Sequence, residues 1–177
     1  MDKVYRDNYN KEIVKFGYLL MMEYAIFCGV SLGIAISRGM IIEYIIILLT
    51  YFFIRSYAGG VHMKSYLECL ICSCILIYVI FWLIENLYIS TEATMIGIVV
   101  VSAILGWMGP VECKERKIEQ VQFKILERHL RKNLLFLIGI ACCFYLIKAY
   151  SSIKVLGLSL TSILIACIIQ KVILINR

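Results

Sequence analysis

A histidine and a cysteine seven residues apart, His62 and Cys69, follow the glycine pair Gly59 and Gly60 at the edge of an apolar segment. An imidazole beside a thiol promotes the nucleophilic thiolate, and it can later return the proton to a leaving amine. Such a pair is the minimum equipment for acyl transfer by a cysteine. The residue types therefore predict Cys69 as a nucleophile and His62 as its base.

The spacing of this pair constrains the backbone. Seven residues of straight α-helix rise about 10.5 Å, whereas proton transfer needs a contact of about 3 Å. The chain must therefore bend, or a helix must begin after His62. Gly59 and Gly60 favour such a break, because glycine adopts backbone conformations closed to other residues. Ser65 is expected to cap the next helix, since Glu68 stands three residues later in capping-box spacing.

Two charged residues in the neighbouring apolar segments are candidates for supporting roles. Arg55 is either a membrane anchor or a guanidinium that holds a substrate carboxylate or backbone. Glu23 lies about 10 Å into the first apolar run, where an ionisable group indicates a functional site. Glu23 is the candidate third member that orients His62, or else a snorkelling or hydrogen-bonded glutamate. Glu43 is expected to neutralise Arg38.

The other cysteines and the second histidine do not suggest a metal centre. Cys72 and Cys74 point to different faces of a helix, and no second Cys/His pair at structural zinc spacing accompanies them. We therefore predict no metal and no cofactor. The eight cysteines do not follow the spacing of a secreted disulfide framework, so mostly free thiols are expected. His129 is interpreted as a solvated residue of a basic loop.

The composition predicts an all-α polytopic membrane protein that forms one domain over residues 1–177. Of the residues, 62% are hydrophobic and 17% are charged, and the mean hydropathy is +0.89. A soluble domain has roughly 45–50% apolar and about 25% charged residues. The single proline suits a helical chain. The net charge of +6 fits anionic lipid headgroups better than nucleic acid.

Six apolar runs approach the length of about 20 residues that a bilayer requires. They cover residues 16–36, 40–54, 67–87, 93–109, 134–150 and 153–173. The second run is short, which leaves a tilted span or a re-entrant segment as alternatives. Residues 1–15 are predicted to form an interfacial helix, and residues 111–133 a basic loop.

The distribution of Lys and Arg predicts the orientation. With the N-terminus inside, only three of the 18 Lys and Arg residues fall in the outer turns, namely Arg38, Lys148 and Lys154. Positive residues mark cytoplasmic segments of membrane proteins. We therefore expect both termini, the 111–133 loop and the site on the cytoplasmic side of the cell membrane.

The segment from Arg55 to Cys69 resembles the motif of the accessory gene regulator protein B (AgrB) family of bacterial membrane cysteine endopeptidases. This motif is an Arg, a Gly-x-His and a Cys seven residues after the His, and all of them occur here at matching spacing. Further features fit over nearly the whole chain, although only the 55–69 motif is specific. They are Lys15-Phe-Gly-Tyr18 with Glu23, the length, the six spans and the basic loop opened by Pro110.

The resemblance implies a thiol protease of quorum sensing in Gram-positive bacteria. Such proteins process a small AgrD-like precursor peptide into an autoinducing peptide. The cysteine attacks at the C-terminal side of the future signal, the acidic tail leaves, and a peptide thiol captures the thioester as a thiolactone. By this resemblance Cys69 is the nucleophile and His62 the base, with Arg55 and Gly60 in support. The basic segment is expected to attract the acidic tail through Lys114, Arg116, Lys117, Arg128, Arg131 and Lys132.

Two non-enzymatic functions are alternatives to the enzyme, namely a membrane peptide exporter and a membrane scaffold. Both explain the apolar spans, but neither requires the pair His62 and Cys69. Substitution of Cys69 discriminates between them and the enzyme. The expected partners are the precursor peptide, the lipid bilayer and a second copy of the chain in a homodimer, and no nucleic acid.

Overall fold

Six helices make up the part of the chain that the structure describes, and this part contains no strand. The computed structural model describes the backbone of residues 2–59, 66–111 and 120–175. Within these ranges it describes all side chains except those of residues 2–13, 15–17, 19–20, 23, 66, 69, 120–121 and 174. The helices are α1 (Asp2–Ser37), α2 (Ile41–Ala58), α3 (Tyr66–Asn86), α4 (Thr91–Met108), α5 (Gln120–Leu146) and α6 (Tyr150–Ile175). The predicted all-α fold is confirmed.

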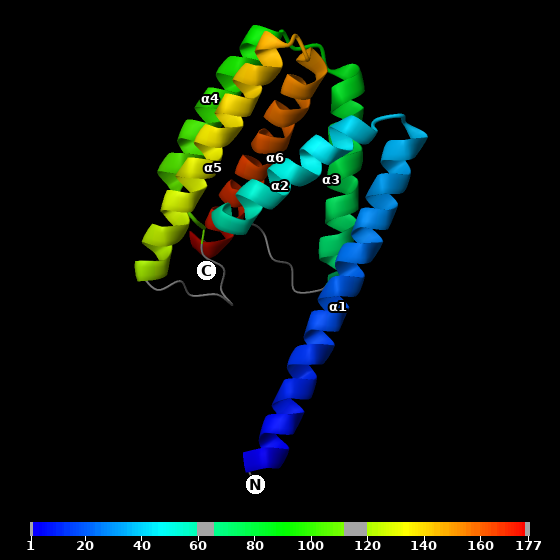
Figure 1. Ribbon diagram of the computed structural model, residues 1–177, viewed down its shortest axis with the longest axis vertical. Coiled ribbons are helices and arrows are strands. Elements are labelled where there is room, and N and C mark those ends of the chain that lie inside the picture. Colours follow the sequence, from blue (N-terminus) through cyan, green and yellow to red (C-terminus); the bar gives the residue numbers. More distant parts are fainter. Residues whose placement is uncertain (1, 60–65, 112–119, 176–177) are drawn as a thin grey trace.

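Successive helices run in alternating directions along the bundle (Figure 1). The turns 37–41, 86–91 and 146–150 lie at one end, which we call the turn end. At the other end α2 and α4 finish and α3 and α5 begin, and both chain termini lie on this side (Figure 1). We call it the motif end, because the 55–69 motif connects α2 to α3 there. The helix α2 crosses the bundle obliquely from one end to the other.

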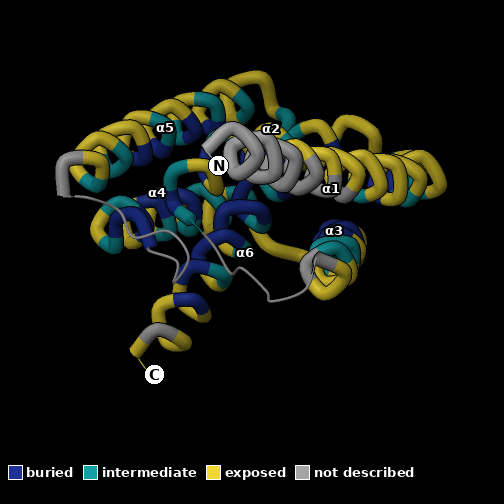
Figure 2. The backbone as a smooth tube through the Cα atoms, turned by 90° about the horizontal axis from the view of Figure 1, so that it is seen from below, coloured by how far each residue is buried: buried dark blue, intermediate teal, exposed yellow. Residues whose placement is uncertain are grey.

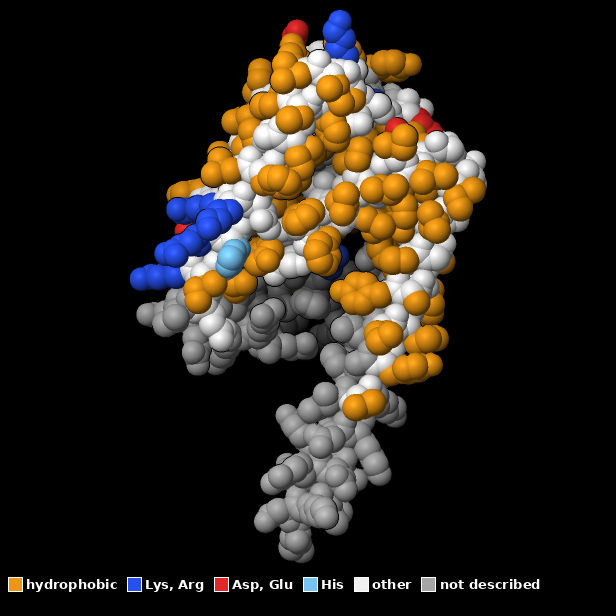
Figure 3. Space-filling model, in the orientation of Figure 1, with side chains coloured by type: hydrophobic (Ala, Val, Ile, Leu, Met, Phe, Trp, Pro, Cys, Tyr) orange, Lys and Arg blue, Asp and Glu red, His pale blue; other side chains and the backbone are white. Residues whose placement is uncertain are grey.

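Four helices are long and apolar enough to cross a bilayer by length and composition. These segments are Ile41–Ala58, Thr91–Met108, Gln122–Leu146 and Tyr150–Ile173. The described residues of α1 and α3 add the shorter apolar stretches Tyr24–Ser37 and Leu70–Asn86. Hydrophobic side chains cover much of the face seen in Figure 3, as expected for a surface that meets lipid.

Three predicted boundaries differ from the observed ones. Residues 2–37 form one continuous helix of 36 residues, so no separate interfacial helix precedes the first span. The helix α2 continues beyond residue 54 to Ala58, which makes it 18 residues long and long enough to cross a bilayer. The predicted basic loop 111–133 is helical from Gln120 onwards. The high charge of this segment predicted a loop. Its Gln, Lys, Glu, Arg and Leu residues are strong helix formers, however, so the segment is helical.

The buried side chains form two cores that share α2. The first, the α4–α6 core, joins the motif-end half of α2 to α4, α5 and α6, and dark blue residues gather where these helices face one another (Figure 2). The second, the α1–α3 core, joins the other half of α2 to α1, α3 and the start of α6. Its buried members are Ala35, Tyr44, Ile47, Ile77, Ile80, Phe81, Ile84 and Val155.

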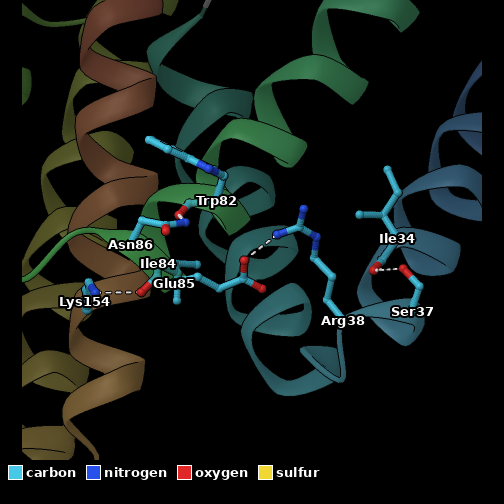
Figure 4. A network of polar contacts seen from close by, with 8 residues as sticks. All are labelled: Ile34, Ser37, Arg38, Trp82, Ile84, Glu85, Asn86 and Lys154. Atoms are coloured by element: carbon cyan, nitrogen blue, oxygen red, sulfur yellow. Dashed lines mark hydrogen bonds and ion pairs between the residues drawn. The ribbon is translucent and has the colours of Figure 1, made fainter.

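Polar contacts tie the second core together at the turn end (Figure 4). Arg38 Nη1 lies 2.6 Å from Glu85 Oε2, and its guanidinium stacks 4.8 Å from the ring centre of Tyr78. Lys154 Nζ donates to Ile84 O at 2.6 Å. The predicted pairing of Arg38 with Glu43 is therefore wrong. Glu43 instead accepts a hydrogen bond from Ser151 on α6 at 3.2 Å.

Candidate active site

The predicted interruption of the helix within the 55–69 motif is present. The helix α2 ends at Ala58, and α3 begins at Tyr66, so no single straight helix carries the motif. The backbone of Cys69 lies in the first turn of α3, while its side chain is not described. Gly60, His62 and Ser65 lie outside the described residues, so their predicted roles stay predictions.

Gly59 ends α2 in a conformation that suits glycine alone. Its φ is +79°, and its N–H bonds to Arg55 O at 3.1 Å. A Cβ at this position would stand 2.5 Å from Val111 O, closer than real side chains approach. Both the backbone angle and the close approach of Val111 therefore explain why glycine occupies the entrance to the motif.

The end of α2 is held by two other parts of the chain. Val111 N donates to Ala58 O at 2.9 Å, which satisfies a carbonyl that the helix end leaves free. Cys167 of α6 is buried, and its sulfur lies 3.9 Å from Ala58 O and 4.0 Å from Gly59 O. The segment after α4 and the helix α6 thus fix the point from which the chain departs toward His62.

Arg55 lies in the last turn of α2, one turn before Gly59, and its side chain is exposed. The two ion pairs among the described residues are Arg38–Glu85 and Glu127–Arg131, and Arg55 takes part in neither. Its position at the motif end is compatible with both roles weighed from the sequence, anchor and substrate contact.

The predicted tail contacts on α5 differ in whether they bind other parts of the protein. Arg131 Nη2 pairs with Glu127 at 2.5 Å, and Arg131 Nε donates to Gly106 O at 3.3 Å, so this residue joins α5 to α4. Arg128 and Lys132 are exposed and four residues apart. Lys124 lies one turn before Arg128 on the same face, and it was not among the predicted tail contacts. Lys114, Arg116 and Lys117 lie outside the described residues.

The structure does not test the predicted role of Glu23. Its backbone belongs to α1, its side chain is not described, and its neighbours Met22 and Tyr24 are exposed. The described buried polar side chain of α1 is Ser31, two turns further along, where its hydroxyl bonds to Tyr44 of α2 at 2.9 Å. A role for Glu23 as the third member of the site therefore stays a prediction.

Contacts between α5 and α2 add residues that the sequence did not single out. The ring of His129 packs on Tyr57 with centroids 5.6 Å apart, so His129 is exposed but is not merely solvated. Asn133 Nδ2 donates to Phe53 O at 2.7 Å. An asparagine four residues after a histidine on an otherwise apolar helix face was the available signal.

The six described cysteines are all free thiols, in agreement with the prediction for them. Cys167 is buried, Cys74 is partly exposed, and Cys28, Cys72, Cys142 and Cys143 are exposed on the apolar surface. Within the described ranges no three His, Cys, Asp or Glu side chains come close enough together to hold a metal ion.

The sequence model of the family Accessory gene regulator B matches residues 1–174. The chain belongs to this family. The match covers essentially the whole chain, so it confirms the resemblance that rested mainly on the 55–69 motif. Searches of curated proteins and of solved structures give no match. Four of its helices can cross a bilayer, so the chain is a membrane protein. As a member of the Accessory gene regulator B family, it acts in the accessory gene regulator system with a peptide precursor.

Proposed function

We propose that this chain is a membrane cysteine endopeptidase that cleaves the precursor peptide through a thioester on Cys69. The observation that carries the proposal is the break between α2 and α3. The helix α2 ends at Ala58, ahead of His62, and the described part of α3 carries Cys69 in its first turn, which is compatible with a contact between His62 and Cys69. The first turn of α3 also suits a thiolate at Cys69, because the N-terminus of a helix stabilises negative charge.

The proposed reaction has two acyl transfers. The imidazole of His62 takes the proton of the Cys69 thiol, and the thiolate attacks the peptide carbonyl at the C-terminal side of the signal. The C–N bond breaks, the imidazolium protonates the leaving amine, and the acidic tail departs. A cysteine thiol of the bound peptide then attacks the thioester, which forms the thiolactone and regenerates Cys69. The apolar surroundings limit competing attack by water.

A chain that keeps Cys69 as its sole cysteine tests this assignment. The other seven cysteines are replaced by Ala, except Cys167, which becomes Ser because it contacts the end of α2. We expect this chain to retain at least about a third of the cleavage rate of the natural chain. The measurement is precursor cleavage in membranes, followed by mass spectrometry. A folded but inactive chain would show that another thiol is required.

We further propose that the motif end faces the cytoplasm. The support is the distribution of Lys and Arg, which favours the segments at this end. Tyr88 lies at the turn end and is 97% exposed, so a cysteine there should be accessible from outside. In the chain that keeps only Cys69, Tyr88→Cys should react with a membrane-impermeant maleimide added to intact cells. Labelling only after the cells are opened would contradict this orientation.

The exposed stripe on α5 is proposed to attract the acidic tail of the precursor. Lys124, Arg128 and Lys132 recur every four residues, and Figure 3 shows Lys and Arg side chains gathered over this part of the molecule. Exposed charge contacts are each worth about 0.2–1 kcal/mol. Replacing all three by Gln should therefore raise KM roughly five-fold, with kcat unchanged, in a cleavage assay at low salt.

Two controls separate tail binding from lipid anchoring by this stripe. A precursor whose tail acids are neutralised should be insensitive to the triple substitution. The effect on the natural precursor should also fade at 1 M salt, where the Debye length falls to about 3 Å. Equal loss for both precursors would assign the stripe to lipid headgroups or folding.

A further inference from the structure

Three side chains on one face of α5 clasp the motif-end half of α2. His129 packs on Tyr57, Asn133 donates to Phe53 O, and Phe136 packs edge-on against the ring of Phe53 with centroids 6.2 Å apart. The two helices run in opposite directions (Figure 1). His129 and Asn133, four residues apart on α5, therefore meet Tyr57 and Phe53 of α2 in reverse order. We call these five residues the α5–α2 clasp.

The Asn133 amide is the polar centre of the clasp. It is half-buried on a helix whose neighbouring Leu130, Leu134 and Leu137 are buried in the α4–α6 core. If this position required only apolar packing, a leucine would serve as well as Asn133. An amide in such surroundings is costly unless it finds a partner. Its hydrogen bond of 2.7 Å to a main-chain carbonyl fixes α2 in rotation and along its axis, which apolar contacts alone define less sharply.

The bond from Asn133 to Phe53 matters because the 55–69 motif connects two cores. The end of α2 belongs to the α4–α6 core, and α3 belongs to the α1–α3 core. The motif-end half of α2 is held by α5 through Asn133 at Phe53, and its end is held at Ala58 by Val111 and by Cys167 of α6. The buried side chains described for α3 begin at Ile77, two turns after Cys69. The first described turns of α3 are exposed or half-buried. The described contacts therefore fix the start of the connection toward His62 from the α2 side.

We propose that Asn133 is a positioning residue for the site, and this inference rests on the proposed function. The Asn133 amide holds the last two turns of α2 in register with α5. Arg55 and Gly59 thereby take fixed positions, and the chain toward His62 starts from a fixed point. Asn133 itself touches neither reacting group. A misplacement of about 1 Å from a distant change can cost a reaction about 100-fold.

The test uses Asn133→Leu, which keeps the side-chain size but removes the donor, and Asn133→Gln, which keeps the donor. The matched control is Ser31→Ala, which removes a hydrogen bond of α2 to α1 in the other core. All variants are made in the chain that retains only Cys69. The measurements are kcat and KM for precursor cleavage, and the pH dependence of Cys69 alkylation by iodoacetamide.

We expect Asn133→Leu to lower kcat about ten-fold with KM within two-fold. The alkylation curve should also shift to higher pH, because His62 no longer assists the thiol. Asn133→Gln should recover at least half of the lost kcat, and Ser31→Ala should leave both readouts within two-fold. Unchanged kcat and alkylation in Asn133→Leu would overturn the proposal, as would an equal effect of Ser31→Ala.

A second donor-free variant, Asn133→Ala, covers the case in which Asn133→Leu does not accumulate in membranes. If neither variant accumulates, the amide serves folding and the positioning role is overturned. The proposed function fails separately, because cleavage retained by Cys69→Ala would exclude the thioester whatever Asn133 does. Loss of cleavage in Cys69→Ala together with a normal Asn133→Leu would overturn the positioning role alone.

Discussion

Cys69→Ala is expected to abolish cleavage of the precursor peptide, with a loss of at least about a thousand-fold in kcat. Removing the nucleophile of a covalent protease takes away the acyl intermediate, and such losses reach about a million-fold in kcat. Cys69→Ser should be nearly as inactive, because a hydroxyl is a far weaker nucleophile than a thiolate at neutral pH. The measurement is cleavage in membranes at matched amounts of protein.

Cys72→Ala is the matched control for this loss. Cys72 lies three residues later on α3, and it is an exposed free thiol. Its replacement should leave cleavage within two-fold. Full activity of Cys69→Ala would instead favour one of the two non-enzymatic readings, the exporter or the scaffold, since neither depends on a particular thiol.

Gly59→Ala should lower cleavage at least about ten-fold. Gly59 combines a φ of +79° with a ψ of −163°, a backbone conformation essentially restricted to glycine, and such strain costs another residue about 1–3 kcal/mol. The added Cβ would also stand 2.5 Å from Val111 O, so either α2 or the segment after α4 must move. That movement breaks the bond from Val111 N to Ala58 O and displaces the chain that leads to His62. The measurement is the cleavage rate of the variant, together with its thermal stability in detergent.

Gly39→Ala separates backbone strain from displacement of the site. Gly39 has a similar φ of +67°, but a Cβ there would meet nothing within 4 Å. It lies at the turn end, far from the motif. This variant should lose stability through strain alone and keep cleavage within two-fold. An equal loss of cleavage in both glycine variants would mean that general destabilisation, rather than the contact with Val111, explains the effect.

The sequence predicted the helices well because their signal is local. Long apolar runs and a single proline leave few alternatives to a helical membrane bundle. The predicted start of α5 is wrong because charged residues do not end a helix there. Residues 120–133 are charged but carry helix-forming side chains, including the pair Glu127 and Arg131 at i and i+4. The helix α5 therefore begins 14 residues before the predicted span, which starts at residue 134.

Contacts between distant segments were harder to predict. Glu43 is near Arg38 in sequence, but Arg38 lies beside Glu85 because the second core brings the end of α3 to the turn after α1. The donor to Ala58 O is a main-chain N–H of Val111, and no side-chain pattern marks such a group. The roles proposed for His62 and Cys69 rest on residue type and spacing, whereas the groups that hold α2 were found only from the fold.

Direct detection of the thioester tests the central claim most directly. Membranes containing the natural chain are incubated with a precursor whose ring-forming cysteine is replaced by serine, so that the second acyl transfer is slowed. The reaction is stopped in acid and the protein is digested for mass spectrometry. We predict that the peptide containing Cys69 carries the N-terminal fragment of the precursor, and that hydroxylamine removes it. Cleavage of the precursor with the fragment on another residue, or with no adduct on Cys69, would contradict the account.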